Sequence, residues 1–166
     1  MDENDGFYAG VWEEGEFVKG DLTGKGKITF SDGSFQTGNY KQFRLNGLGE
    51  WHFANGDSYK GEFDNGRYSG KGEYTWKEDG MRYEGRFEAG KRKGFGTLYL
   101  PDNYVLNGSW INDCVDGESE ITMQPKDGTD PLSAKLVVEN CEVTSSTLPT
   151  DQQSKIHPLV IRKIRN

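Results

Sequence analysis

The chain has 166 residues, enough for one domain with a short extension, and only 33% of them are conventionally hydrophobic. Its net charge of −7 argues against nucleic acid and anionic lipid as default partners, because an acidic body repels phosphates. Two cysteines, Cys114 and Cys141, do not make a disulfide framework in a chain of this length. No stretch resembles a signal peptide or reaches transmembrane length, so the sequence favours a reducing, cytoplasmic location.

Glycine and aromatic residues divide the chain into two regions. All 23 glycines and all the aromatic residues (9 Phe, 8 Tyr and 4 Trp) lie before residue 129. We therefore predict a repeat domain over residues 1–128. Residues 129–166 form a C-terminal extension, partly β, that serves as a cap or a linker.

The glycines of the first region recur at a nearly constant spacing, and this period predicts five tandem units. One set of glycines opens the units at intervals of 23 to 28 residues: Gly10, Gly38, Gly61, Gly85 and Gly108. A second set follows nine residues later in the last four units: Gly47, Gly70, Gly94 and Gly117. The first unit reaches its equivalent, Gly24, after a five-residue insertion within Glu16–Thr23. The units span residues 7–34, 35–57, 58–81, 82–104 and 105–128.

Within each unit, bulky residues and glycines alternate with polar residues, as they do over residues 59–63. This period of two places the rings and the glycines on one face of a β-strand. Turn dipeptides such as Asn55-Gly56 and Asn65-Gly66 separate the strands and predict hairpins. The expected fold class is all-β: an elongated, open, single-layer antiparallel sheet of ten strands in five hairpin repeats.

Glycine on the same face as the rings has a packing consequence. Glycine normally weakens a strand, so its recurrence there indicates that each ring lies flat across a neighbouring glycine. A single sheet can then bury aromatic surface without a second sheet against it. Each buried ring contributes on the order of a few kcal/mol.

The third and fourth units carry a recognisable motif. The pattern Tyr-x-Gly-x-Phe-x-x-Gly-x-x-x-Gly-x-Gly stands at residues 59–72 and again at residues 83–96. This pattern, repeated over roughly residues 7–128, resembles the MORN repeat. The units depart from it at a few positions: Gln36, Phe43, Leu106, Asp113 and Ser119. The resemblance implies an open ribbon whose groove holds a partner segment, in a scaffold placed at a membrane, the cytoskeleton or a cilium.

The aromatic face is the candidate partner-binding site, because an exposed apolar strip with charged edges is typical of recognition surfaces. We expect the regular middle units to carry it, with some rings in the groove and others in internal packing. The candidate residues are Trp51, Phe53, Tyr59, Phe63, Tyr74, Trp76, Tyr83 and Phe87.

A basic run, Lys91-Arg92-Lys93, lies in a predicted hairpin turn and is either a solvated turn or a contact with anionic lipid. The sequence shows no nucleophile–base pair, phosphate loop or metal-ligand spacing, so we expect no catalytic residue, no metal and no cofactor.

The extension divides into three segments. Residues 132–143 are rich in β-branched residues and predict one or two further strands. Residues 144–158 are polar, contain two prolines and are typical of a linker. The apolar and basic end, residues 159–165, has three interpretations: a strand that closes the edge of the sheet, a segment that docks into the acidic groove in cis or from another copy, or a segment that continues into a longer protein.

These features predict a non-enzymatic, protein-binding scaffold that holds a basic or apolar peptide segment of another protein. The alternative is a peripheral membrane tether that binds anionic phospholipid through local basic patches. Self-association through an exposed end strand would make the chain a homo-oligomer.

Overall fold

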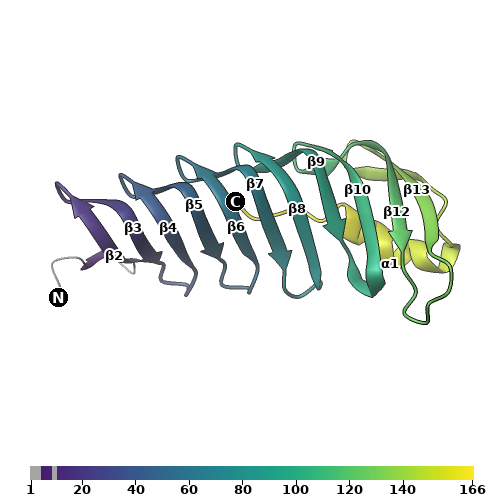
Figure 1. Ribbon diagram of the computed structural model, residues 1–166, viewed down its shortest axis with the longest axis horizontal. Helices are drawn as coiled ribbons and strands as arrows, with labels where there is room; N and C mark the ends of the chain where they lie inside the picture. The colour runs from purple at the N-terminus through teal and green to yellow at the C-terminus, as the bar shows by residue number, and fades with distance from the viewer. Residues whose placement is uncertain (1–4, 9–10) are drawn as a thin grey trace.

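The computed structural model describes residues 5–8 and 11–166. They form one elongated, open antiparallel sheet and a short C-terminal helix (Figure 1), as the sequence predicts. Thirteen strands follow one another in chain order, and β11 pairs with β10 beside them. The elements are β1 (Asp5–Tyr8), β2 (Val11–Val18), β3 (Asp21–Thr29), β4 (Phe35–Lys41), β5 (Arg44–His52), β6 (Ser58–Asp64), β7 (Arg67–Trp76), β8 (Met81–Glu88), β9 (Lys91–Tyr99), β10 (Tyr104–Ile111), β11 (Cys114–Val115), β12 (Gly117–Met123), β13 (Leu132–Glu139), β14 (Glu142–Ser146) and α1 (Thr150–Val160).

One face of the sheet carries the rings and the glycines, and we call it the aromatic face. Residues directly opposite each other on paired strands point to the same face. A row of such partners therefore runs along the ribbon across the repeat units. Its members are Glu13, Ile28, Gln36, Trp51, Tyr59, Tyr74, Tyr83, Leu98, Leu106 and Ile121.

This row corrects the predicted register of the first unit. The glycine that pairs like Gly38 is Gly15, opposite Gly26, and it stands nine residues before Gly24. No insertion is present within residues 16–23. The predicted opening glycine, Gly10, lies outside the described residues, and the opening strand of the first unit is β2, which pairs with β3 on one side and with β1 on the other. The opening glycines are thus spaced by 23 or 24 residues throughout.

Rings lie across glycines as predicted. A Cβ added at Gly72 would meet the ring of Tyr59, with 2.6 Å to its Cε2 atom. Tyr83 lies in the same way over Gly96. The Tyr59 hydroxyl donates a hydrogen bond to the Glu62 carbonyl at 2.7 Å, so the ring is held at both ends. Tyr59 and Tyr83 are fully buried in a single-layer sheet because glycine lets each ring approach the backbone.

A two-residue turn joins the two strands within each unit, and hydrogen bonds from these turns also link neighbouring units. Both turn residues have positive φ, as type I′ hairpin turns require; at Asn65-Gly66 the values are 50° and 85°. The Gly66 N–H donates to the Leu45 carbonyl at 2.8 Å, one unit back along the ribbon. Equivalent bonds join Phe43 to Leu22, Gly90 to Tyr68 and Asp113 to Arg92.

The extension continues the sheet and then returns across it. β13 pairs with β12 and β14 with β13, so two strands form over residues 132–146. The sheet therefore continues past the predicted boundary at residues 128–129, which lie in the loop between β12 and β13. The linker predicted over residues 144–158 is wrong, because most of it lies in α1, whose buried residues Ile156 and Val160 join the core. The helix contains Pro158 and lacks a side-chain N-cap, so its sequence carries weak helix signals.

The two cysteines also differ from expectation. Cys114 and Cys141 form a disulfide, with their Cα atoms 5.5 Å apart. Cys114 begins β11, directly after the turn that follows β10, and Cys141 lies in the turn after β13; the order of the sheet brings these two ends together. A disulfide persists in oxidising surroundings, whereas a reducing compartment would hold the two residues as thiols.

Replacing Gly72 by alanine tests the packing of rings on glycines. The new methyl group would overlap the Tyr59 ring, and overpacking of this kind destabilises by about 1–3 kcal/mol. Urea denaturation would measure the loss. Gly128→Ala is the control, because its methyl group would meet nothing within 4 Å and only its φ of 78° is strained. A loss at Gly72 no larger than at Gly128 would contradict this account.

Candidate functional site

The end of the chain lies on the aromatic face. After α1, residues 161–166, which we call the tail segment, run back along the ribbon and end beside β7 (Figure 1). The tail segment lies against side chains of the third, fourth and fifth units. The docking of the end of the chain in the groove in cis, one of the three interpretations left open by the sequence, is the one that the structure shows.

Backbone groups of the tail segment are bound by side chains from both edges of the groove. Arg92 Nη2 donates to the Arg162 carbonyl at 2.7 Å, and Trp76 Nε1 donates to the Lys163 carbonyl at 3.0 Å. The Ile164 N–H donates to Asp113 Oδ2 at 3.0 Å. The groove therefore supplies both donors and acceptors to the backbone of the tail segment.

The last residues are held in the same manner. The Arg165 N–H donates to the Tyr74 hydroxyl at 3.1 Å, and the Tyr68 hydroxyl donates to the Arg165 carbonyl at 2.7 Å. Asn166 Nδ2 donates to the Gly90 carbonyl at 2.7 Å. Most of these contacts are thus made to backbone atoms of the tail segment rather than to its side chains.

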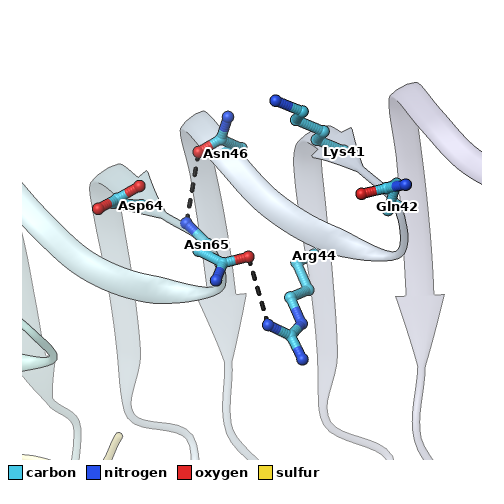
Figure 2. A pocket seen from close by; sticks show the side chains of 6 residues that line it. All are labelled: Lys41, Gln42, Arg44, Asn46, Asp64 and Asn65. Atoms are coloured by element: carbon cyan, nitrogen blue, oxygen red, sulfur yellow. Dashed lines mark hydrogen bonds between the residues drawn. The ribbon is translucent and has the colours of Figure 1, made fainter.

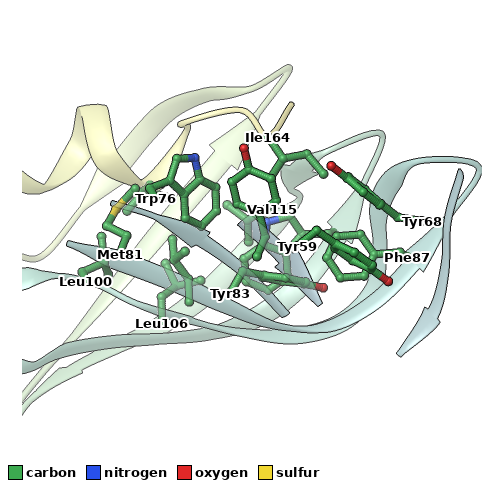
Figure 3. Close-up of a cluster of buried hydrophobic side chains, with 14 of the residues drawn as sticks. Tyr59, Tyr68, Trp76, Met81, Tyr83, Phe87, Leu100, Leu106, Val115 and Ile164 are labelled. Atoms are coloured by element: carbon green, nitrogen blue, oxygen red, sulfur yellow. The ribbon is translucent and has the colours of Figure 1, made fainter. Parts of the chain in front are cut away.

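One side chain of the tail segment gives apolar specificity. Ile164 is 9% exposed and joins the buried cluster with Trp76, Tyr68 and Val115 (Figure 3). The basic residues around it, Arg162, Lys163 and Arg165, are exposed, and Arg162 pairs with Asp79 at 3.2 Å. The tail segment thus places one apolar side chain between basic residues.

A buried ion pair lies under the tail segment. Arg92 Nε and Asp113 Oδ1 are 2.6 Å apart, and the two side chains are 1% and 8% exposed. The guanidinium also lies within 6 Å of the ring centres of Trp76, Tyr83 and Trp110. In earlier units the position of Arg92 holds an apolar residue, such as Leu45. The position of Asp113 holds glycine in most earlier units, as at Gly66. Where earlier units have residues that pack within the sheet, this pair has groups that bind the backbone of the tail segment.

The eight predicted site residues separate into three groups. Tyr74 and Trp76 bind the tail segment directly. Tyr59, Phe63, Tyr83 and Phe87 are buried in contact with one another and form internal packing. Trp51 and Phe53 stay partly exposed beyond the end of the tail segment.

Three groove residues escaped the sequence prediction: Tyr68, Arg92 and Asp113. Tyr68 and Arg92 stand two residues before the second glycine of their units, where the predicted strands had not yet begun. If the alternation of each strand is extended by two residues toward the turn, both side chains fall on the aromatic face. Asp113 was noted only as a replacement for glycine.

The basic run requires a correction. Arg92 is completely buried, so it cannot contact lipid, and only Lys91 and Lys93 are exposed. Lys93 pairs with Glu88 at 3.0 Å, and Lys91 donates to Asn112 at 3.0 Å. The strand period alternates these side chains between solvent and the aromatic face.

Burial keeps the groove tyrosines protonated. Removal from water raises the pKa of Tyr83 to about 12, and it also raises the pKa values of Tyr59, Tyr68 and Tyr74. The hydroxyls therefore act as hydrogen-bond donors at neutral pH. The Tyr74 hydroxyl, which accepts from Arg165, donates to Asp57 Oδ2 at 3.0 Å.

A second hollow, of about 610 Å³, lies between the turns of the second and third units (Figure 2). Its lining is polar and of mixed charge, with Asn65 accepting from Arg44 and donating to Asn46. Over residues 5–8 and 11–166, the structure has no group of three or more His, Cys, Asp or Glu side chains placed to hold a metal ion. No helix of the described chain is long and apolar enough to cross a membrane.

The fold and the site together define a single-layer repeat protein with a groove that binds the backbone of an added segment. The MORN repeat family model matches residues 14–35, 37–58, 59–81 and 83–103, which together make just over half of the chain. The chain therefore belongs to the MORN repeat proteins, whose repeats are generally protein- or membrane-binding motifs and which are typically non-enzymatic scaffolds. No curated protein matches the chain.

Asp113→Asn should destabilise the chain by about 3–5 kcal/mol, because Arg92 would stay buried without a counter-charge. Urea denaturation measures the loss. Lys93→Ala, which breaks an exposed pair, is the control and should change stability by at most about 1 kcal/mol. The double variant Arg92→Leu with Asp113→Gly restores the pattern of earlier units and should recover most of the loss. A double variant as unstable as the single one would contradict a charge effect.

Alkaline pH should unfold the chain cooperatively. The pKa of Tyr83 rises from its ordinary value of 10.0 to about 12 in the folded state, so stability is full below pH 10 and falls as pH rises from 10 toward 12. Tyrosinate absorbance and circular dichroism, recorded together, should change in one transition for the buried tyrosines. Complete ionisation with an unchanged dichroism spectrum would contradict this prediction.

Proposed function

We propose that this protein is a non-enzymatic scaffold whose aromatic groove holds an extended segment of a partner protein. The observation that carries the proposal is the tail segment, which the groove already binds through five main-chain groups and the side chain of Ile164. A groove that binds one extended segment by its backbone can bind another with the same pattern.

The contacts define the segment that fits. Two of its N–H groups donate, at the positions of Ile164 and Arg165, so neither position accepts proline. The position of Ile164 needs an apolar side chain, and the positions beside it face solvent and Asp79. The partner segment is therefore basic and apolar, and it competes with the tail segment.

The membrane tether is the weaker candidate. Binding to anionic lipid generally takes four to eight clustered basic residues. The basic run lies at the start of β9 rather than in a turn and supplies only Lys91 and Lys93, and Arg162 is paired with Asp79. Sedimentation with anionic vesicles at physiological salt separates the two candidates, since only a tether pellets.

Placement in the cytoplasm at the cytoskeleton, a cilium or a membrane stays a prediction. The redox state of Cys114 and Cys141 bears on it, because the cytoplasm would hold both residues as thiols.

A chain that ends at Val160 tests the proposal. It should bind a synthetic peptide with the sequence of residues 159–166, and the indole N–H resonance of Trp76 should shift on binding, because it donates to the Lys163 carbonyl. Heteronuclear NMR gives the affinity. The matched control is the same peptide with Ile164→Pro, which lacks the N–H that Asp113 accepts and should bind at least about tenfold more weakly. Equal binding of both peptides would sink the proposal.

A further inference from the structure

The aromatic face is covered at one end only. Over the third to fifth units, α1 and the tail segment bury it, and the cluster in Figure 3 lies there. Over the first two units no described segment lies across it, and large side chains packed against the core remain partly exposed. These side chains are Phe17, Phe30, Phe43, Trp51 and Phe53, and we call this region the open end.

The open end contains two buried polar atoms that have no hydrogen-bond partner among the described residues. One is Oε2 of Glu13, whose residue is 8% exposed, and the other is Nε1 of Trp51. Both residues belong to the row that runs along the aromatic face, with Ile28 and Gln36 between them. Burial without a partner raises the pKa of Glu13. An unpaired buried acceptor of this kind is unfavourable, and a ligand that donates a hydrogen bond to it would offset that cost.

These two atoms match the groups that bind the tail segment. In the covered part of the groove, an indole N–H donates to a main-chain carbonyl and a buried carboxylate accepts from the segment. In the open end, Trp51 offers an indole N–H and Glu13 offers a carboxylate. The same two functions are thus present beyond the point where the tail segment stops.

A hollow joins the two parts. A pocket of about 340 Å³ begins at Asn166 and is lined by Tyr68 and Trp51, so the path of the tail segment leads into the open end. Across the first two units, the described salt bridges include no partner for Glu13. A cation brought by a ligand would therefore meet an unpaired acid.

We propose that the open end is a second docking site, which binds an extended segment of a partner protein end to end with the tail segment. Trp51 donates to a main-chain carbonyl of that segment, its apolar side chains cover the exposed rings, and a lysine or arginine pairs with Glu13. This inference rests on the proposed function but concerns a part of the groove that the tail segment does not occupy. A partner can therefore bind while the tail segment stays in place.

Heteronuclear NMR on the full chain tests the inference. The probe is an acetylated and amidated peptide with the sequence of residues 159–166, and the reporters are the indole N–H resonances of Trp51, Trp76 and Trp110. The tail segment, as part of the chain, competes at an effective concentration on the order of millimolar, so a free peptide well below that level leaves Trp76 covered. We expect a saturable shift of Trp51 with no shift of Trp76.

Two comparisons identify the acid. Glu13→Gln should weaken peptide binding at least about tenfold, since a charge-assisted contact is lost. Glu14→Gln is the matched control, because it removes the same charge from the neighbouring residue, whose side chain points to the other face opposite Lys27. A peptide with Arg162, Lys163 and Arg165 changed to Glu should not bind. If Glu13→Gln fails to fold, Trp51→Phe replaces it, with the backbone amide of Ile28 as reporter and a loss of binding expected.

Four outcomes would overturn the inference. The first is an unshifted Trp51 at millimolar peptide, and the second is an affinity that Glu13→Gln leaves unchanged. The third is a Trp51 shift that depends on protein concentration without peptide, which would make a second copy of the chain the occupant. A peptide that shifts Trp76 alone would also overturn it while leaving the proposed function intact, because that result places the peptide in the covered part of the groove.

Discussion

The contact of an aromatic ring with a strand glycine is the constraint on which this structure depends. Tyr59 over Gly72 and Tyr83 over Gly96 bring large apolar surfaces against the backbone, so the sheet needs no second layer to bury them. Because rings and glycines share one face of the strands, only that face can bury its side chains by this contact. The ribbon is therefore one-sided, and rings that stand above the glycines, such as Trp76, need a cover that the sheet itself does not supply.

The chain supplies that cover for part of its length, and the manner of covering determines what the surface can bind. An apolar strand added at the edge would extend the ribbon, but it would leave the aromatic face exposed. A segment laid across the strands instead places its own backbone N–H and C=O groups over rings, where unpaired polar groups are costly. Trp76, Tyr74 and Asp113 satisfy these groups, so the polar atoms of the groove follow from the need to bury a backbone. Recognition of extended segments is a consequence of this arrangement.

The period of two and the spacing of glycines were sufficient to predict the sheet, because each repeat makes the same contacts with its neighbours. They failed at the first unit, because the sequence of residues 8–12 matches the motif, whereas Gly15 is the residue that pairs as the opening glycines of later units do. The helix α1 was unpredictable for another reason. It has no side-chain N-cap and contains Pro158, and its stability comes from Ile156 and Val160, which pack on a surface formed by distant units. The disulfide likewise depends on the order of strands.

The binding residues were hardest to find because they break the repeat pattern. Arg92 stands two residues before the second glycine of its unit, where the other units have an apolar residue, and Asp113 stands where most units have glycine. Taken alone, each residue resembles a random departure from the repeat motif. Together they form one buried pair that also binds two residues of the tail segment. Glu13 breaks the pattern in the same way, as an acid in a row of mostly apolar or uncharged residues, but without a partner among the described residues. In a repeat protein of this kind, buried departures from the motif mark the places where the sheet binds something other than itself.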